Sequence, residues 1–174
     1  MSFAEVKLHQ KQIVDLYKNV LIQTETLINS VEKVVENSEI KKALEFLGDH
    51  KKHITIIIQD PNAVHISDDK LDFLTNLLTA CKLSLADVAI INLASKNIQY
   101  RLIKDSLQTE YLILMGIDIK QFQLPIIFPK NKIQQFDNCN MLIAEDIGLL
   151  MGVNSNVKTE KKALWNALKQ MFNL

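Results

Sequence analysis

The sequence predicts an α/β domain with a mostly parallel central sheet, preceded by an N-terminal helical arm. Short apolar segments such as 54–58 are rich in β-branched residues, which is typical of strands buried on both faces. Amphipathic helical segments separate them, and this alternation favours right-handed crossovers between parallel strands. The length of 174 residues suffices for one core and an arm. We therefore divide the chain into an arm, 1–36, and an α/β domain, 37–174.

The arm carries a long apolar stripe. Its apolar residues recur at spacings of three, four and seven, which predicts one long helix or a hairpin broken near residues 24–29. Such a stripe must be buried against the core, a second copy of the chain, or another protein. Self-association and partner binding through the arm are therefore both open. The candidate partner-binding residues are Ile13, Leu16, Tyr17, Val20, Leu27 and Val31.

The elements of the α/β domain follow in order along the chain. Helix starts are expected at capping residues such as Ser67, and ends at residues such as Gly48, which adopts left-handed geometry at little cost. The predicted helices are 38–47, about fourteen residues from Ser67, a helix from near Ser95 with Ile98 and Leu102 inward, and 157–172. The predicted strands are 54–58, 88–93 and 111–115, with 125–128 and 141–144 as shorter additions to the sheet.

Composition excludes several classes of function. The 20 basic and 20 acidic side chains balance, so direct DNA binding driven by net charge is expected to be weak or absent. Neither a secretory leader nor a membrane-length apolar run is recognisable, which predicts a cytoplasmic protein without membrane attachment.

Cofactor and metal motifs are not found either. Cys81 and Cys139 have no companion cysteines and are expected to be buried thiols. His50 and His53 lack a third ligand, so we interpret their segment as a solvated loop. The glycines form neither a phosphate-binding loop nor a dinucleotide fingerprint. We expect no cofactor and no bound metal.

Two polar residues follow the first two predicted strands. Asp60 comes just after the first strand, and Asn92 lies at the end of the second. If these strands are parallel neighbours, both side chains face one crevice, where ligands gather in open α/β sheets. Asp60 is then either a catalytic carboxylate or a turn residue before Pro61, since Asp commonly forms turns.

The segments that hold these residues resemble a known enzyme family. "IIIQDPNAVH" is similar to the Gly-Gln-Asp-Pro-Tyr-His motif of uracil-DNA glycosylases, and "LSLADVAIINLAS" resembles their later strand that ends in a base-reading asparagine. The resemblance implies a three-layer α/β/α sandwich. It also implies that Asp60 would position water and stabilise charge on the sugar, while Asn92 would pair with an extruded base.

The second catalytic motif of that family is absent. Where a late strand should end in His-Pro-Ser, the sequence has Ala144, Glu145 and Asp146. Carboxylates there would repel the uracil anion that the histidine stabilises. We therefore expect no enzyme activity and interpret Asp60 and Asn92 as vestigial candidates, with a divergent DNA glycosylase or nucleobase-binding protein as the alternative.

The C-terminal segment resembles a second family. "IAEDIGLLMGVNSNVKTEKKALWNALKQMF" is similar to the end of the psi subunit of the bacterial DNA polymerase III clamp-loader complex, including an Ala-Leu-Trp motif at Ala163, Leu164 and Trp165. "KLSLADVAIINLASKNI" resembles its middle segment. This family shares the glycosylase-like fold and is not catalytic. The resemblance implies a protein-interaction subunit in DNA replication, with clamp-loader subunits as partners.

Overall fold

The structure is a computed structural model that describes residues 44–94, 98–122, 124 and 129–174. They belong to one compact unit, 44–174. The arm, its six candidate binding residues, the boundary at residue 37 and the predicted strand 125–128 lie outside the described residues. Within the described part, no helix combines the length and the apolar character that crossing a membrane requires.

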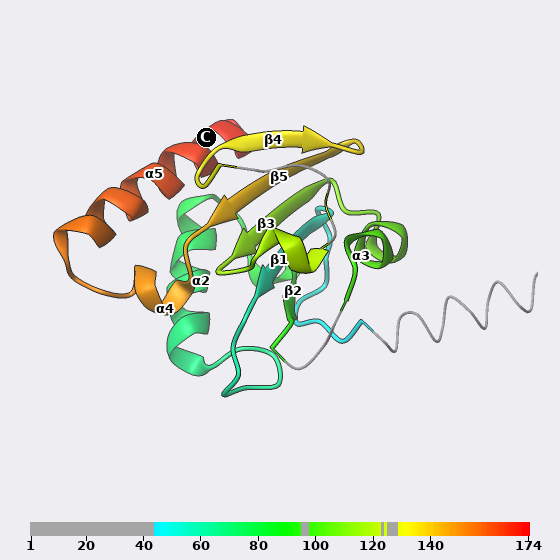
Figure 1. The fold of residues 1–174 in the computed structure, drawn as a ribbon, viewed down its shortest axis with the longest axis horizontal. Coiled ribbons are helices and arrows are strands. Elements are labelled where there is room, and N and C mark those ends of the chain that lie inside the picture. Colours follow the sequence, from blue (N-terminus) through cyan, green and yellow to red (C-terminus); the bar gives the residue numbers. More distant parts are fainter. Residues whose placement is uncertain (1–43, 95–97, 123, 125–128) are drawn as a thin grey trace, which may run out of the picture. The chain divides into compact units, whose positions relative to one another are not determined.

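A five-stranded mixed sheet forms the centre of the unit, in the order β2-β1-β3-β5-β4 (Figure 1). Strands β1, β2, β3 and β5 run parallel, and β4 pairs with β5 in the antiparallel direction. The strands are β1 (Ile54–Ile58), β2 (Val88–Asn92), β3 (Tyr111–Met115), β4 (Ile133–Phe136) and β5 (Cys139–Ala144). The expected α/β character and the three apolar strands are thus confirmed.

Five helices or turns of helix longer than three residues accompany the sheet in the described residues. They are α2 (Asp68–Ala80), α3 (Tyr100–Leu107), the short 3-10 helix η2 (Ile119–Phe122), α4 (Ile147–Leu150) and α5 (Ser155–Phe172). The alternate residues Ile54, Ile56 and Ile58 of β1 share one core cluster with buried side chains of α2, α4 and α5. These three helices therefore cover one face of the sheet, because alternate strand residues point to the same face.

Helix α3 contacts the opposite face. Its buried residues include Tyr100, whose ring lies 5.9 Å from that of Phe136 in β4. Ile133, three residues before Phe136, packs against the core cluster on the first face. Since side chains alternate along a strand, Phe136 and α3 lie on the second face.

Two predicted helices need correction. Residues 44–47, the end of the helix predicted at 38–47, are not helical, and Leu47 forms an antiparallel bridge with Ile90 of β2. Pairing with an open strand edge has overridden the local helical pattern. The helix expected from near Ser95 begins at Tyr100, and it buries Ile103 rather than Leu102, which is only half-buried.

The pattern of apolar residues did not predict β4. Asp137 and Asn138 connect β4 to β5 and have φ angles of 50° and 53°. A two-residue hairpin turn with two positive φ angles favours Asn, Asp and Gly. The pair Asp137-Asn138 was therefore a usable hairpin signal, although β4 itself is short and half polar.

Candidate functional site

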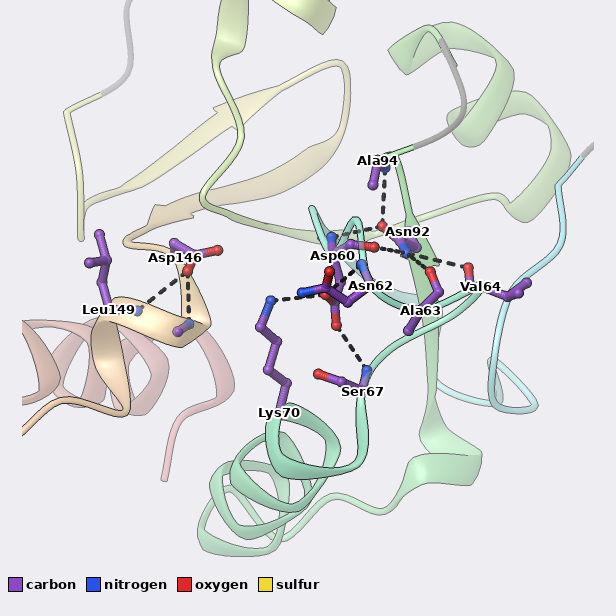
Figure 2. Close-up of polar contacts among 11 residues, drawn as sticks. Asp60, Asn62, Ala63, Val64, Ser67, Lys70, Asn92, Ala94, Asp146 and Leu149 are labelled. Atoms are coloured by element: carbon purple, nitrogen blue, oxygen red, sulfur yellow. Dashed lines mark hydrogen bonds and ion pairs between the residues drawn. The ribbon is translucent and has the colours of Figure 1, made fainter.

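Asn92 ends β2 opposite Ile58 of β1, and its side chain enters the loop between β1 and α2 (Figure 2). Its Oδ1 accepts hydrogen bonds from the backbone N–H groups of Asp60 at 2.9 Å and Ala94 at 3.1 Å. Its Nδ2 donates to the backbone oxygens of Asp60 at 2.7 Å and Ala63 at 2.7 Å. Asn92 is 3% exposed. Both the oxygen and the nitrogen of its carboxamide are hydrogen-bonded to backbone groups of the chain.

Asp60 is buried beside it and is 1% exposed. Its Oδ2 accepts the backbone N–H of Ser67, the residue that precedes α2, at 2.9 Å, and its Oδ1 accepts the backbone N–H of Asn62 at 3.3 Å. A carboxylate at a helix start is favoured because the first N–H groups of a helix lack partners. Asp60 thus closes the loop that Asn92 holds from the other side.

The pKa of Asp60 reflects these contacts. Burial alone would raise it, because burial disfavours the charged form. Hydrogen bonds from Ser67, the Lys70 ammonium and the Asn62 N–H outweigh burial and lower the pKa to about 2. Asp60 is therefore an anion at neutral pH, and its charge is already compensated within the protein. A general base needs a higher pKa, nearer the working pH.

Lys70 of α2 completes this cluster. Its Nζ lies 3.2 Å from Oδ1 of Asp60, and its side chain is 19% exposed. A Cβ added to Gly148 of α4 would lie 3.8 Å from Cε of Lys70, so the lysine stem runs towards the start of α4. Figure 2 shows Lys70 extending from α2 to Asp60, and Asp146 lies on the other side of Lys70 from Asp60.

The carboxyl ends of β3 and β5 form the other half of the same sheet edge. Asp146 precedes α4, and its Oδ1 accepts the backbone N–H groups of Gly148 at 2.8 Å and Leu149 at 3.3 Å. Gly116 follows β3 with a φ angle of +69°, and a Cβ there would lie 2.8 Å from Cβ of Asp146. Glycine is required at this position by both its backbone angle and the close approach of Asp146.

A cleft of about 510 Å³ opens on this half. Its lining includes Asp118, Lys130, Glu145, Asp146 and Leu149. Lys130 and Glu145 form an ion pair at 2.6 Å, and the hydrogen bond from Lys130 lowers the pKa of Glu145. This half of the edge therefore holds a cleft and an exposed apolar side chain.

Three of the five large apolar residues that are exposed in the described part of the chain lie in α4 or the turn after it. The other two are Val64 in the β1–α2 loop and Leu174 after α5. Leu149 is 60% exposed and Val153 is 84% exposed, with Met151 between them at 38%. Several exposed apolar side chains within a short segment are typical of a contact surface for another molecule, whereas single ones are common on any surface.

The structure places Asp60 and Asn92 side by side at the ends of parallel neighbouring strands, as expected. The Asn92 amide contacts the backbone of Asp60, however, and both residues are buried, so they do not face an open crevice. Sequence reasoning missed Lys70, whose contact with Asp60 spans two elements and has no local signal. It also missed the role of Asp146. An Asp that directly precedes an apolar helical turn is a common helix cap, so the sequence did contain a signal for this role.

The two histidines depart from the solvated loop that we expected. His50 is half-buried, and its Nε2 lies 3.2 Å from Oγ1 of Thr55 in β1. Burial and the neighbouring His53 lower the pKa of His50. Among the described residues, no group of three or more His, Cys, Asp and Glu side chains is placed to hold a metal ion.

Comparisons with known proteins add no relative. No protein-family description matches the sequence, and a search of curated proteins finds no match. The geometry above and the short motifs in the sequence therefore carry the functional proposal.

Proposed function

We propose that this protein is a non-catalytic interaction subunit that acts in DNA replication, as its resemblance to the psi subunit of the DNA polymerase III clamp loader implies. The observation that carries the proposal is the saturation of Asn92. Both ends of its carboxamide are held by backbone groups of the β1–α2 loop. A base-reading asparagine needs those same atoms for the base.

The state of Asp60 supports the same proposal. Its carboxylate accepts two backbone N–H groups and pairs with Lys70. Asp60 is 1% exposed, so a water molecule could reach its carboxylate only if the loop opened and one of these buried contacts was lost. An unpaired buried donor costs about 1–3 kcal/mol, so the arrangement favours a loop-holding role over catalysis.

For the fold, we propose the three-layer α/β/α sandwich of the uracil-DNA glycosylase-like superfamily. Helices α2, α4 and α5 share a core cluster with one face of the sheet, and α3 contacts the other through Tyr100 and Phe136. A scaffold inherited from such enzymes would explain why an Asp and an Asn stand at the ends of adjacent strands. Fold by itself does not imply activity.

For the partner, we propose a clamp-loader subunit in the cytoplasm. We assign the contact to two groups of apolar side chains. One is the stripe in residues 1–36, and the other is the α4 surface, which we define as Leu149, Met151 and Val153. Truncating an interface anchor typically costs more than 1 kcal/mol of binding, even where the folded chain is unaffected.

Affinity purification of the full chain from its native cells tests this function. Recovery of clamp-loader subunits is expected, and it should be lost when Leu16 and Val20 on the stripe are both replaced by Glu. Asn19→Glu adds one negative charge, where the double variant adds two, at a position outside the stripe, and it should retain the partner. Leu149→Asp tests the α4 surface in the same way, with Lys158→Asp on α5 as its exposed control.

Recovery of unrelated proteins only, with every variant behaving as the wild type, would contradict the proposal. Circular dichroism of each variant should match the wild type, so that a loss of partner is not a loss of fold.

A further inference from the structure

Within the described residues, the two edges of the sheet differ in how they are covered. At the β2 edge, Leu47 and Ile90 exchange backbone hydrogen bonds of 2.9 Å and 2.8 Å, and the N–H of His50 donates to the oxygen of Val88 at 3.1 Å. The segment before β1 therefore protects this edge. At the other edge lies β4, which among the described strands pairs only with β5.

The backbone groups that β4 presents outward follow from its register. Gln135 stands opposite Asn140 of β5. The N–H of Asn140 points away from β4 and donates to the oxygen of Glu110, just before β3, at 2.8 Å. In an antiparallel pair, residues that do not bond each other point their N–H and C=O groups away from one another. Gln135 and, two positions earlier, Ile133 thus direct both backbone groups out of the sheet.

Nothing in the sequence of β4 blocks pairing at this edge. Its residues, Ile133 to Phe136, include no charge and no proline, which are common means of protecting an edge strand. The exposed charges lie at its two ends, with Lys132 before it and Asp137 after it. An antiparallel neighbour of the same sequence would place its Asp137 end beside Lys132, and its Lys132 end beside Asp137.

We propose that β4 is a self-association edge, where two copies of the chain pair antiparallel through β4 to form one continuous sheet. The two-fold axis passes beside Gln134, so that Ile133 of each copy faces Gln135 of the other and every outward N–H and C=O of these residues is paired. Lys132 of each copy then stands opposite Phe136 of the other, one position from its Asp137, so opposite charges lie near each other at both ends of the contact. A second copy of the chain fits this edge because β4 and its flanking charges are complementary to themselves in hydrogen bonding and in charge.

The contact is short, so the dimer is expected to be weak and to depend on concentration. Sedimentation of the full chain from about 10 µM to about 1 mM should show a monomer–dimer equilibrium. Gln135→Pro removes an outward N–H and leaves the bonds to β5 in place, so it should weaken the dimer by about tenfold. Lys132→Glu should weaken it by about threefold and reverse its dependence on salt.

Amide hydrogen exchange gives a readout that does not depend on any variant. The amides of Ile133 and Gln135 should become protected as concentration rises, whereas the amide of Gln134, which faces β5, should exchange at the same rate throughout. A monomer at every concentration would overturn the proposal. So would a dimer that neither protects these two amides nor responds to Gln135→Pro, because it would form through another surface.

Discussion

The two halves of the strand-end edge use their polar side chains differently. At the ends of β1 and β2, Asp60 and Asn92 are buried and bonded to backbone, with Lys70 compensating the charge. At the ends of β3 and β5, Asp146 caps one turn of helix beside an open cleft and the exposed Leu149. A polar pair at a strand end is thus not sufficient for a reactive site, because its atoms must also be free.

The largest expected effect comes from Asn92→Ala. The substitution leaves the N–H of Asp60 and the oxygens of Asp60 and Ala63 without their buried partner, so we expect a loss of about 3 kcal/mol in the free energy of unfolding. Urea unfolding measures it. Asn62→Ala is the matched control in the same loop, because that side chain is exposed and should change stability by less than about 0.5 kcal/mol. Equal effects of the two would show that Asn92 does not hold the loop.

Asp60→Asn should have the next largest effect, and it should depend on pH. The folded pKa of about 2 lies below the ordinary 3.8, which corresponds to about 2 kcal/mol of stability. Because the pKa is lowered on folding, this stabilisation is complete above about pH 4 and is lost as pH falls towards about 2. The difference in unfolding free energy between wild type and Asp60→Asn should follow that course. A difference that stays constant down to pH 2 would contradict the low pKa.

Lys70→Met should cost about 1 kcal/mol, because Asp60 would lose a partly buried partner but keep its backbone N–H donors. The substitution should also raise the pKa of Asp60, which NMR titration of its carboxyl carbon measures. Lys51→Gln breaks an ion pair that is about two-thirds exposed on both sides, and it should have no measurable effect on stability. If both lysines behave alike, Lys70 does not compensate Asp60.

The smallest effect on stability is expected on the open half. Leu149→Ala should change the free energy of unfolding by less than about 0.5 kcal/mol, because the side chain is 60% exposed. Its neighbour Leu150 is 1% exposed, so Leu150→Ala should cost about 3 kcal/mol. A large loss from Leu149→Ala would mean that α4 is packed more closely than its exposure indicates.

The sequence predicted those features that depend on local pattern. The bounds of β1 and β3 follow directly from apolar runs, and contact between Asp60 and Asn92 follows from parallel pairing of β1 and β2. What it could not predict depends on distant partners. Leu47 left its helical pattern to pair with Ile90, and the role of Lys70 is visible only once α2 lies beside Asp60.

The local sequence pattern likewise could not predict the direction in which the Asn92 amide points. The same residue at the same strand end could point into an empty crevice or into the β1–α2 loop. Only the conformation of residues 60–64, which turns their backbone groups towards it, decides between the two.

The most direct test of the central claim, that Asp60 and Asn92 hold a loop and do not act on a base, is the release of uracil from single- and double-stranded DNA. Purified wild-type protein should release none above background, because the Asn92 amide is occupied and no imidazole lies in the segment 141–150 to stabilise the departing base. Release by the wild type that disappears in Asp60→Asn, while the variant remains folded at pH 7, would contradict the account and identify Asp60 as a catalytic residue.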